Sequence, residues 1–513
     1  MKILFIARHW TYFRNYDAAI RMLAARGHRI HLAVEVEDKL GGEGAVRALA
    51  NESPGVTVGT IPPSRPDTWS SIAPRIRLAI DYLRYLDPFY DDAPLRRVRA
   101  RNRTPRLLAA GANPPVIGGP RWRRLYGRVL HALDALVPPS ESIVSYVAGV
   151  APDVLLVTPL VDLGSQQIDY VRAARRLGIP CGLPVWSWDH LTSKALLRDY
   201  PDRVLVWNET QRDEAVRVHH VPAERVVVTG AQCFDHWFTR QPSRSRDEFC
   251  ARLNLPADRP VILYVCTGVI QGSPPEVDFV IEWLGALRRS ADAAVAGASI
   301  LIRPYPSTAA VWNGVDLAPY GPVAVWGGNP IDERSRADYF DSLFHSAAVV
   351  GLNTSAFIEG AIVGRDVLTL LVPRFHDNQM GTAHFRYLVE VGGGMLRIAR
   401  SMEEHVAQLG TALRRPASPE HPHRQFLAAF IRPHGLTSPA TPVFVQAVEA
   451  LGLAVPVPGR VRSPAWTRAV LGGAVRGASW LIGDRLVRSP RELDPARQAA
   501  LTATNATQGE ERP

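Results

Sequence analysis

Residues 347–360 read AAVVGLNTSAFIEG. The apolar start of this stretch predicts a β-strand, and it is followed at once by Asn353, Thr354 and Ser355, residue types that cap helix N-termini. The free N–H groups of a first helical turn bind phosphates. Glu359 lies on the same helix face as Ser355, one turn deeper, where its carboxylate can accept hydrogen bonds from ribose hydroxyls. A plainly capped helix with a surface glutamate is the alternative.

The alternation of a β-branched run and an amphipathic helix extends to both sides of this stretch. In the second half, strands are expected at 261–266, 299–303, 323–326, 347–352 and 367–371, and helices at 277–289, 337–346 and 355–364. In the first half, strands are expected at 2–7, 30–36, 153–158, 181–186, 203–207 and 225–229, with one more before residue 62, and helices at 16–26, 165–177 and 209–219. This order predicts an α/β fold of two Rossmann-like, doubly wound domains that face a central cleft.

The length of 513 residues also favours more than one domain. We expect a first domain at 1–240, a second domain at 241–435, a helical extension at 436–489 and a disordered tail at 490–513. The first domain is expected to carry an Arg-rich helical insertion at about 62–145. Pro and Ser residues in 241–260 are typical of a linker.

The net charge of +10 comes from one segment. Ten arginines and no acidic residue lie between Ala93 and Leu133, so the rest of the chain is close to neutral. Only 3 of the 59 basic residues are lysines. A GC-rich genome explains this excess of arginine. Because nucleic-acid binders normally mix lysine and arginine, the excess argues against a nucleic-acid partner. The segment is either a solvated surface or a surface for an anionic partner, with Trp122, Leu125 and Tyr126 as apolar anchors beside the charge.

Several classes of protein are excluded by what the sequence lacks. The 4 cysteines are far apart and form no C-x-x-C pair, so neither a zinc site nor a disulfide framework is indicated and a reducing compartment is expected. Neither a signal-peptide core nor an apolar run of about 18 residues occurs. P-loop, G-x-S-x-G, H-E-x-x-H and Asp-x-Asp motifs are missing, and no metal site is indicated. We expect a cytoplasmic or peripherally bound protein.

The first half has its own candidate site, in the strand exit that reads VWSWDHLTSK over residues 185–194. Asp189, an imidazole, hydroxyls and Lys194 fall together there, and loops at strand ends are where rigid scaffolds place functional groups. A buried tryptophan pair beside a helix-capping residue is the alternative. His9 follows the first strand at the same edge and is a second candidate for a base, although a lone histidine is often structural.

Further candidates follow strands of the second half. Arg303 and Tyr305 belong to the sequence IRPYP at 302–306, where Arg303 is expected to be a fixed cationic fork, with a structural turn as the alternative. Thr267 and Gly268 follow the strand at 261–266. The polar loop at 375–385 adds His384 and Gln379 as secondary candidates.

From Met1 to Leu451 this layout resembles the GT-B glycosyltransferase superfamily. Residues 303–306, RPYP, resemble the strand-end phosphate turn of glycerol-phosphate polymerising transferases and non-hydrolysing UDP-sugar epimerases, which often have a histidine at the position of Tyr305. Residues 338–359 resemble the nucleotide-binding element shared with capsule-type glycosyltransferases. The resemblance implies an N-terminal acceptor domain, a C-terminal nucleotide-donor domain and no obligatory metal.

The expected activity is transfer of a sugar from a nucleoside-diphosphate donor to an acceptor hydroxyl, in cell-surface polysaccharide or glycolipid synthesis. Asp189 is preferred as the base, His9 is the alternative, and Lys194 would close over the diphosphate. Donor-binding candidates are Arg303, Tyr305, Asn353, Thr354, Ser355, Glu359, His384, Thr267 and Gly268.

Three other activities stay open: polyol-phosphate transfer from a CDP-glycerol-type donor, 2-epimerisation of a UDP-sugar, and a non-catalytic protein that binds anionic surfaces. No cofactor and no metal are expected. The expected partners are a nucleotide-sugar, a glycan or lipid-linked acceptor and, through 93–133, an anionic membrane at the inner face of the plasma membrane.

Overall fold

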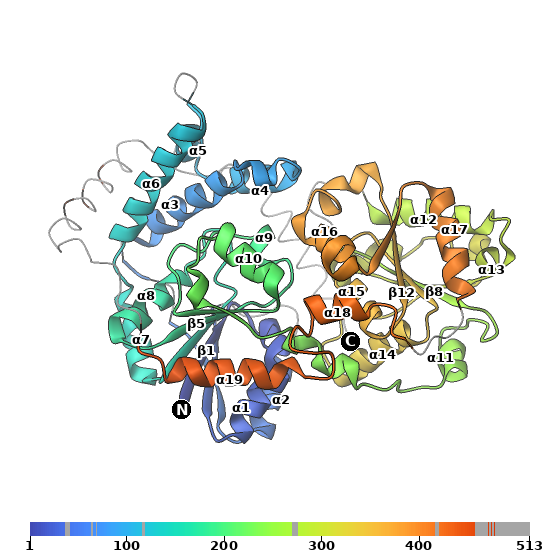
Figure 1. Cartoon of the computed structure of the whole chain (residues 1–513), viewed down its shortest axis with the longest axis horizontal. Coiled ribbons are helices and arrows are strands. Elements are labelled where there is room, and N and C mark those ends of the chain that lie inside the picture. Colours follow the sequence, from blue (N-terminus) through green and yellow to red (C-terminus); the bar gives the residue numbers. More distant parts are fainter. Residues whose placement is uncertain are drawn as a thin grey trace.

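The computed structural model describes residues 1–35, 42–62, 65–67, 69–114, 118–268, 275–415 and 420–456, together with residues 470, 473 and 477. These residues form two parallel sheets, each covered by helices on both faces (Figure 1). The predicted α/β class with two doubly wound domains is confirmed. The expected disordered tail at 490–513 lies outside the described residues.

The first sheet has seven strands in the order β3-β2-β1-β4-β5-β6-β7. All neighbouring strands are parallel, and every residue of β4 is buried because helices cover both faces. The strands are β1 (Lys2–Ala7), β2 (Arg29–Val34), β3 (Val56–Thr60), β4 (Val154–Thr158), β5 (Cys181–Pro184), β6 (Arg203–Val206) and β7 (Val226–Val228).

The second sheet repeats this arrangement with six strands in the order β10-β9-β8-β11-β12-β13. In both sheets the strand order reverses beside the first strand, between β1 and β4 and between β8 and β11. Ligands of open α/β sheets bind at this reversal, outside the carboxyl ends of the strands. The strands are β8 (Val261–Val265), β9 (Ser299–Arg303), β10 (Val323–Val325), β11 (Ala348–Val350), β12 (Asp366–Leu370) and β13 (Leu396–Ala399).

Alternating side chains divide the core of the first half into two layers. In β1, Phe5 packs with helices α1, α2 and α19, whereas Ile6 packs with α7 and α8 on the other face. The second sheet is divided in the same way, between α14 and α15 on one face and α12 and α17 on the other. The described helices outside the insertion are α1 (Asp17–Ala25), α2 (Gly42–Glu52), α7 (Glu141–Val150), α8 (Ile168–Leu177), α9 (His190–Ser193), α10 (Glu209–Arg217), α11 (Arg246–Arg252), α12 (Glu276–Arg288), α13 (Ala293–Ala296), α14 (Glu333–Phe344), α15 (Ala356–Ile362), α16 (Ala383–Glu390), α17 (Met402–Leu413), α18 (Arg424–Phe430) and α19 (Ala440–Gly452).

The segment between β3 and β4, predicted to be an insertion, contains α3 (Trp69–Arg84), α4 (Pro94–Arg103), α5 (Arg106–Gly111) and α6 (Pro120–Leu136). Buried ion pairs join it to α8, one of the helices that cover the first sheet. Arg77 of α3 contacts Asp134 of α6 at 3.0 Å and Asp169 of α8 at 2.9 Å, and Arg172 of α8 contacts Asp134 at 2.8 Å. The insertion therefore sits rigidly on the first half.

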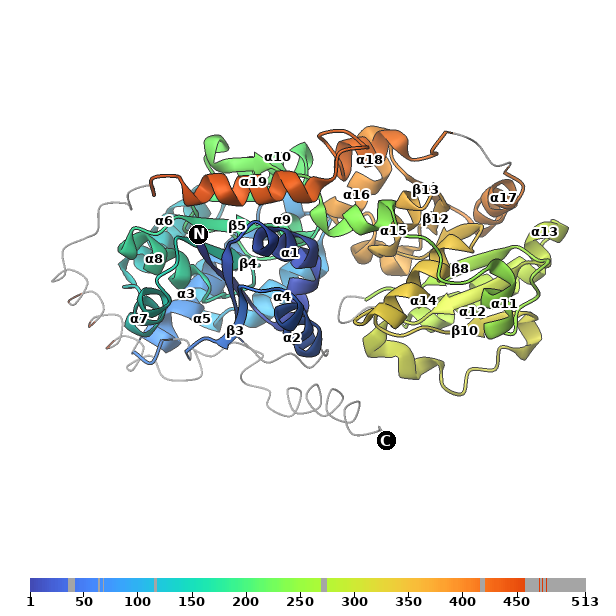
Figure 2. The ribbon, with the colours of Figure 1, turned by 90° about the horizontal axis from the view of Figure 1, so that it is seen from below.

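Helix α19 belongs to the end of the chain but packs on the first sheet (Figure 2). Phe444, Val448 and Leu451 are buried in the core layer of α1. Two glycines allow the close approach: a Cβ on Gly182 would lie 2.7 Å from Leu451 Cδ2, and one on Gly230 would lie 2.6 Å from Ala440 Cβ. The described part of the expected extension at 436–489 is thus a helix that ties the two halves together.

Within the part of the chain that the structure describes, no helix combines the length and apolarity that a membrane crossing requires.

Candidate functional site

The carboxyl ends of neighbouring strands come together at both reversal points. In the first half, Arg8 after β1 forms an ion pair with Asp162 after β4. In the second half, the backbone N–H of Asn353 after β11 donates to the hydroxyl of Thr267 after β8, at 3.3 Å. Each sheet thus presents polar groups at the edge where ligands of this architecture bind.

The two edges also contact each other. Trp188, in the loop after β5, packs edge-to-face on His384 at the start of α16, with 4.8 Å between the ring centroids. Both side chains are buried, at 6% and 5% exposure. The structure therefore brings together the two predicted loops, 185–194 of the first half and 375–385 of the second.

Asp189 is held by its own loop. Its two carboxylate oxygens accept hydrogen bonds from the hydroxyls of Ser187 and Ser193, each at 2.7 Å. Burial alone would raise its pKa, but the nearby positive charge of Lys194 and these hydrogen bonds outweigh burial and hold the pKa well below its ordinary value. Asp189 is therefore a fixed carboxylate at every working pH.

Two histidines beside Asp189 are neutral. Burial is the main cause that lowers the pKa of His190 to about 4 and the pKa of His384 to about 3. His190 Nδ1 faces the backbone N–H of Trp186 at 3.3 Å, and His384 Nε2 faces the side-chain amide nitrogen of Asn353 at 3.5 Å. The other ring nitrogen of each histidine, His190 Nε2 and His384 Nδ1, is buried without a hydrogen-bond partner.

The remaining first-half candidates lie around this loop. The backbone carbonyl of Lys194 accepts hydrogen bonds from Arg84 at 3.0 Å and Tyr85 at 2.6 Å, so the insertion fixes the main chain here. The ring of His9 contacts Tyr12, which in turn contacts Trp186, each at 4.5 Å between centroids. His9 therefore lies at the same edge as Asp189, separated from its loop by Tyr12.

Glu359 is the central carboxylate of the second half. It accepts a hydrogen bond from the hydroxyl of Tyr339 on α14. Burial raises its pKa to about 7, against the opposing influence of that hydrogen bond and of the cations Arg14 and Arg303. Arg14 belongs to the first half, so residues of both halves surround Glu359.

The predicted helix after β11 starts at Ala356, later than expected. The N–H of Ala356 faces the Thr354 hydroxyl at 3.4 Å, whereas Ser355 is exposed and its side chain makes no capping hydrogen bond. Asn353 instead binds the loop after β12, donating to the carbonyl of Asn378 at 2.5 Å, and its side-chain oxygen is buried without a partner.

Arg303, predicted to be a fixed cationic fork, is held in place by neighbouring groups of its own domain. It is 4% exposed, and its terminal nitrogens donate to the Ser342 hydroxyl at 3.0 Å and the Gly328 carbonyl at 3.1 Å. Its guanidinium also lies 4.9 Å from the ring centroid of Tyr339. Arg303 is therefore fixed, and its guanidinium supports Tyr339. Direct contact of Arg303 with a donor stays a prediction.

Tyr305 is half exposed, at 41%, and covers the turn at Gly268. A Cβ on Gly268 would lie 2.8 Å from the tyrosine ring, so glycine is required for this contact. The backbone N–H of Thr267 donates to the carboxyl of Glu276 at 2.7 Å. Thr267, Gly268 and Tyr305 thus form one surface beside Asn353.

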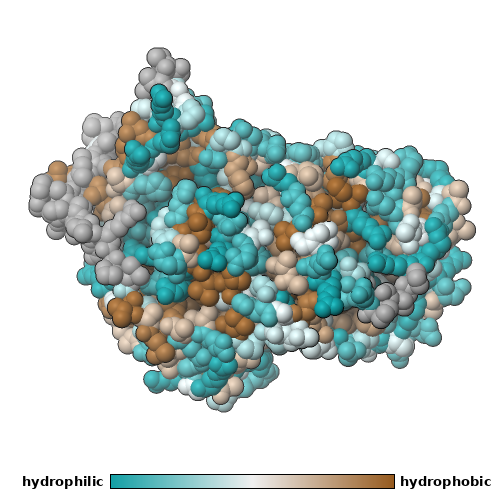
Figure 3. All heavy atoms as spheres, in the orientation of Figure 1, coloured by the Kyte–Doolittle hydropathy of each residue, from teal (hydrophilic) through white to brown (hydrophobic). Residues whose placement is uncertain are grey.

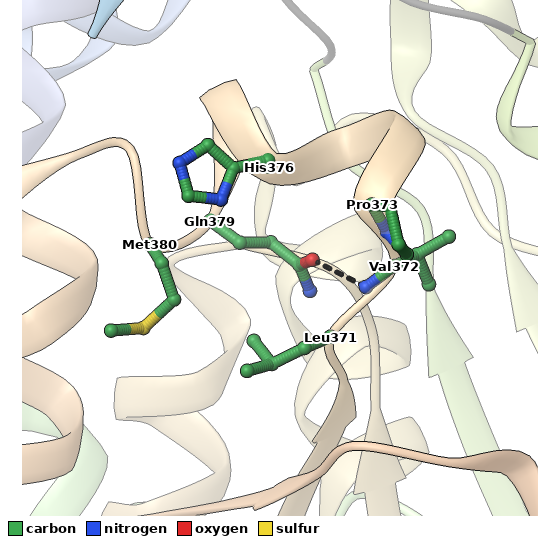
Figure 4. Close-up of a pocket in the computed structure, with 6 residues that line it drawn as sticks. All are labelled: Leu371, Val372, Pro373, His376, Gln379 and Met380. Carbon is green, nitrogen blue, oxygen red and sulfur yellow. Dashed lines mark hydrogen bonds between the residues drawn. The ribbon is translucent and has the colours of Figure 1, made fainter. Parts of the chain in front are cut away.

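Gln379 holds the backbone after β12 in place, and its role as a secondary site candidate stays a prediction. It is 1% exposed, and its side-chain amide binds the N–H of Val372 at 3.0 Å and the carbonyl of Leu370 at 2.8 Å. It lines a hollow of about 340 Å³ after β12 (Figure 4). The other lining residues are Leu371, Val372, Pro373, His376 and Met380.

Three residues at the contact between the halves, Arg96, Glu214 and Tyr387, carry no specific signal in the sequence. Arg96 of α4 donates to the carbonyl of Ser193 at 3.2 Å, but in the sequence it is one of ten arginines. Glu214 of α10 is buried beside the hydroxyl of Tyr387 on α16, and burial raises its pKa to about 8. Spacing in the sequence does not distinguish such residues from surface ones.

No family model matches the sequence, and no curated protein matches it either. Solved structures do match. A glycosyltransferase from Rickettsia africae ESF-5 matches with a TM-score of 0.50 at 8% identity, over 88% of this chain and 98% of that one. The chain has a GT-B-type fold. Two further matches are UDP-GlcNAc 2-epimerase from Methanocaldococcus jannaschii (TM-score 0.48, 11% identity, 88% and 100% covered) and MurG from Acinetobacter baumannii (0.42, 14%, 88% and 99%).

The GT-B-type fold agrees with the resemblance inferred from residues 303–306 and 338–359. At these identities the likeness concerns the fold alone. Activity must therefore be argued from the side chains at the contact between the two sheets.

Proposed function

We propose that the protein is a glycosyltransferase that moves a sugar from a nucleoside-diphosphate donor to an acceptor hydroxyl. The observation that carries this proposal is the contact between Trp188 and His384. Through it, a fixed carboxylate of one Rossmann-like half, Asp189, faces the polar strand ends of the other half. A donor bound by one sheet and an acceptor bound by the other would meet there, with water excluded by the surrounding side chains.

The donor is assigned to the second half. Glu359 would accept hydrogen bonds from the ribose hydroxyls, exchanging its bond with Tyr339. Asn353, Thr354 and Ser355 after β11, with Thr267 and Gly268 after β8, would bind the diphosphate at the reversal of strand order. Tyr305 covers this surface, and Arg303 supports it from behind through Tyr339.

The acceptor is assigned to the first half, with Asp189 as the base. In the reaction the bond between the sugar carbon and the diphosphate oxygen breaks, and the acceptor oxygen bonds to that carbon. The hydroxyl proton passes to the base, and the diphosphate leaves with the electron pair. To act as the base, Asp189 must exchange one serine hydroxyl for the acceptor hydroxyl. His9 is the alternative base.

The first test is a thermal-shift panel of UDP-, GDP-, CDP- and dTDP-sugars. A donor should raise the unfolding temperature, because a ligand that binds only the native state stabilises it. The best ligand is then incubated with and without candidate acceptors. Conversion of the nucleotide-sugar to its epimer without acceptor, or transfer of glycerol phosphate from CDP-glycerol, would contradict glycosyl transfer.

The second test concerns the base. Asp189→Asn should leave donor binding unchanged and lower the turnover rate about 100-fold or more, since that is the usual contribution of a general base. The pH–rate profile separates the two candidates. With Asp189 as the base the rate stays constant down to low pH, because its pKa is held well below the ordinary value. A rate that falls between pH 7 and pH 5 would contradict Asp189 as the base and favour the alternative.

A membrane-bound acceptor fits the surface of α6. One face of this helix exposes Arg121, Arg124 and Arg128 beside Leu125 and Val129, which are 52% and 48% exposed. Figure 3 shows hydrophobic and hydrophilic patches side by side where α5 and α6 lie. Basic and apolar groups on one helix face favour an anionic lipid surface.

Vesicle sedimentation tests this surface. Vesicles with anionic lipid should bind the protein, and binding should weaken in salt and in the variant with Arg121, Arg124 and Arg128 all changed to Gln. Three matched changes on α8 and α10, at Arg175, Arg176 and Arg212, serve as the control for lost charge. Equal binding by both variants would contradict the assignment.

A further inference from the structure

Helix α9 (His190–Ser193) follows Asp189 directly but is too short to be stable by itself. It has four residues, and Asp189 stands at its N-cap position. Helix formation is cooperative, so a single turn is unstable alone. The last carbonyls of any helix also lack partners inside that helix. Groups outside α9 must therefore bind these carbonyls and fix the loop.

Arg84, the last residue of α3, binds three carbonyls at the end of α9. Its terminal nitrogens donate to the carbonyl of Lys194 at 3.0 Å, to that of Ala195 at 2.7 Å and to that of Leu191. Its Nε donates to the hydroxyl of Tyr90 at 2.7 Å. The side chain is 7% exposed, and its guanidinium lies 5.3 Å from the ring centroid of Tyr90. Arg84 is thus a rigid fork directed at the end of α9.

Three further side chains bind the same stretch of backbone. Tyr85 donates its hydroxyl to one of the carbonyls that Arg84 binds, at 2.6 Å, and Arg96 donates to the carbonyl of Ser193 at 3.2 Å. His219, which follows α10, lies with its Nε2 2.6 Å from another of these carbonyls. Helix α9 is therefore held between the insertion and α10 (Figure 1). Cations at its C-terminus also complement the helix dipole.

Asp81, one turn before Arg84 on α3, fixes the adjoining segments. It is fully buried, and its carboxylate accepts hydrogen bonds from the backbone N–H of Leu196 at 3.0 Å and of Gly164 at 2.9 Å. Gly164 belongs to the loop after β4, two residues beyond Asp162. One face of α3 thus holds two neighbouring loops at the edge of the first sheet.

The backbone that Arg84 binds leads directly to the carboxylate of Asp189. Within this stretch, the hydroxyl of Ser193 donates to Asp189 at 2.7 Å. Burial raises the pKa of Asp189, whereas the charge of Lys194 and the hydroxyl of Ser193 lower it. Both of these groups belong to residues whose carbonyls the insertion binds.

We propose that Arg84 is a positioning residue, which orients the Asp189 carboxylate through the backbone of residues 191–195. The role of Asp189 as the base rests on the proposed function, whereas the contacts of Arg84 do not. A base must lie within hydrogen-bond reach of the proton that it accepts, so an error in its orientation slows turnover without weakening donor binding.

Hydrogen exchange followed by mass spectrometry tests the structural step on the full-length protein, without any substrate. Arg84→Lys keeps the charge but cannot make all the hydrogen bonds of the guanidinium. The peptide that covers residues 185–196 should then exchange about tenfold faster than in the wild type, the usual effect of losing a hydrogen bond from a charged group.

Arg77→Lys is the matched control. Arg77 lies two turns earlier on α3 and is equally buried, but it pairs with Asp134 and Asp169. This variant should lower the unfolding temperature and leave exchange at 185–196 unchanged. Equal exchange at 185–196 in Arg84→Lys and Arg77→Lys would overturn the proposal.

Turnover tests the catalytic step. Arg84→Lys should lower kcat about tenfold and leave the KM of the donor unchanged. In the Asp189→Asn background the same change should cause no further loss, because residues that act through one group are not additive. Losses that multiply in the double variant would exclude action through Asp189.

The pH–rate profile gives a readout that a purely structural role would not move. In Arg84→Lys the rate should begin to fall at a higher pH than in the wild type, because Asp189 loses a hydroxyl that lowers its pKa. The other titratable groups that act on Asp189 are unchanged in this variant: Lys194 and His190 of its own loop, His384 of α16, Arg96 of α4, Glu214 of α10 and Tyr12. Arg77→Lys should keep the wild-type profile.

Tyr85→Phe extends the test in case Arg84→Lys does not fold. It removes a single hydroxyl from the carbonyl of Lys194, and it should speed exchange at 185–196 and lower kcat by about threefold each. Wild-type exchange and turnover in this variant and in Arg84→Lys would overturn the proposal. Because exchange is measured without substrate, it decides whether Arg84 holds the loop even if the wild type transfers no sugar, so the two failures are distinguishable.

Discussion

Asp189 and Glu359 have the same functional group, but their environments shift its pKa in opposite directions. A cation and two hydroxyl donors keep Asp189 ionised, whereas burial beside Tyr339 raises the pKa of Glu359 to about 7. Opposite shifts of this kind separate the roles of two carboxyl groups in one site. Asp189 therefore fits the role of a fixed anion in the first half. Glu359 fits the role of a hydrogen-bond acceptor in the second half that gains and loses a proton near neutral pH.

Glu359 should make donor binding depend on pH. Only the ionised carboxylate accepts two hydrogen bonds freely, so affinity for the nucleotide-sugar should rise from pH 6 to pH 8 as the group loses its proton. The same raised pKa means that Glu359 stabilises the free protein below about pH 4.5 and that this contribution is lost through pH 7. Binding calorimetry at several pH values measures the first effect.

Glu359→Gln should weaken donor binding at pH 8 about fivefold to tenfold and remove its pH dependence. Tyr339→Phe is the companion variant: it removes a hydroxyl whose hydrogen bond lowers the pKa of Glu359, so it should raise the pH at which affinity rises. An unchanged pH dependence in Glu359→Gln would exclude Glu359 as the titrating group.

At the scale of elements, Asp235 fixes the start of α19, the helix with which the chain returns to the first half. Its carboxylate accepts hydrogen bonds from the backbone N–H of Ala440 at 3.0 Å and of Thr441 at 2.6 Å, at the start of α19. It also pairs with Arg432 at 2.9 Å, and Arg432 is 6% exposed. One side chain therefore caps the helix and neutralises a buried cation.

Asp235→Ala should destabilise the protein by about 3 kcal/mol or more, since both the cap and the partner of a buried charge are lost. Urea unfolding followed by tryptophan fluorescence measures the change. Asp316→Ala is the control: Asp316 caps only an exposed turn at Ala318, at 3.0 Å, and its loss should cost at most about 1 kcal/mol. Equal losses in the two variants would refute the role of Asp235.

Elements were predictable where the local pattern was strong. The strands at 2–7 and 299–303 have the predicted bounds because apolar β-branched runs end abruptly at polar residues. The edge strand β13 (Leu396–Ala399) was not predicted, because it is short and Arg397 interrupts its apolar pattern. The helix after β11 (Ala356–Ile362) ends before the predicted residue 364, because Gly364 adopts a φ of +74° and terminates it.

At the scale of the whole molecule, Glu214 couples the contact between the halves to pH. It lies on α10, is 4% exposed beside Tyr387 of α16, and burial raises its pKa to about 8. A carboxyl group with a raised pKa stabilises the folded state below about pH 4.5, and this contribution is lost as the pH rises through 8. The unfolding temperature should therefore fall between pH 6 and pH 9.

Glu214→Gln should reduce this fall in the unfolding temperature. The reduction should be about 2–4 °C for each kcal/mol of destabilisation that the buried charge of Glu214 causes at high pH. Differential scanning calorimetry at pH 6 and pH 9 measures the difference. Glu209→Gln on the same helix is the control, because the Glu209 side chain is 70% exposed and its replacement should leave the fall unchanged. An equal fall in the wild type and Glu214→Gln would refute the coupling.

The sequence by itself determined the α/β class, the two doubly wound sheets, the helical insertion and the loops that carry Asp189, Asn353 and His384. These features depend on periodicity, capping and strand exits, which act over a few residues. Only the tertiary structure decided that Arg303 is buried, that Arg96 contacts the Ser193 carbonyl, that α19 returns to the first sheet and that Trp188 meets His384. These facts depend on which distant segments pack together, and local pattern carries no information about partners that lie up to hundreds of residues away.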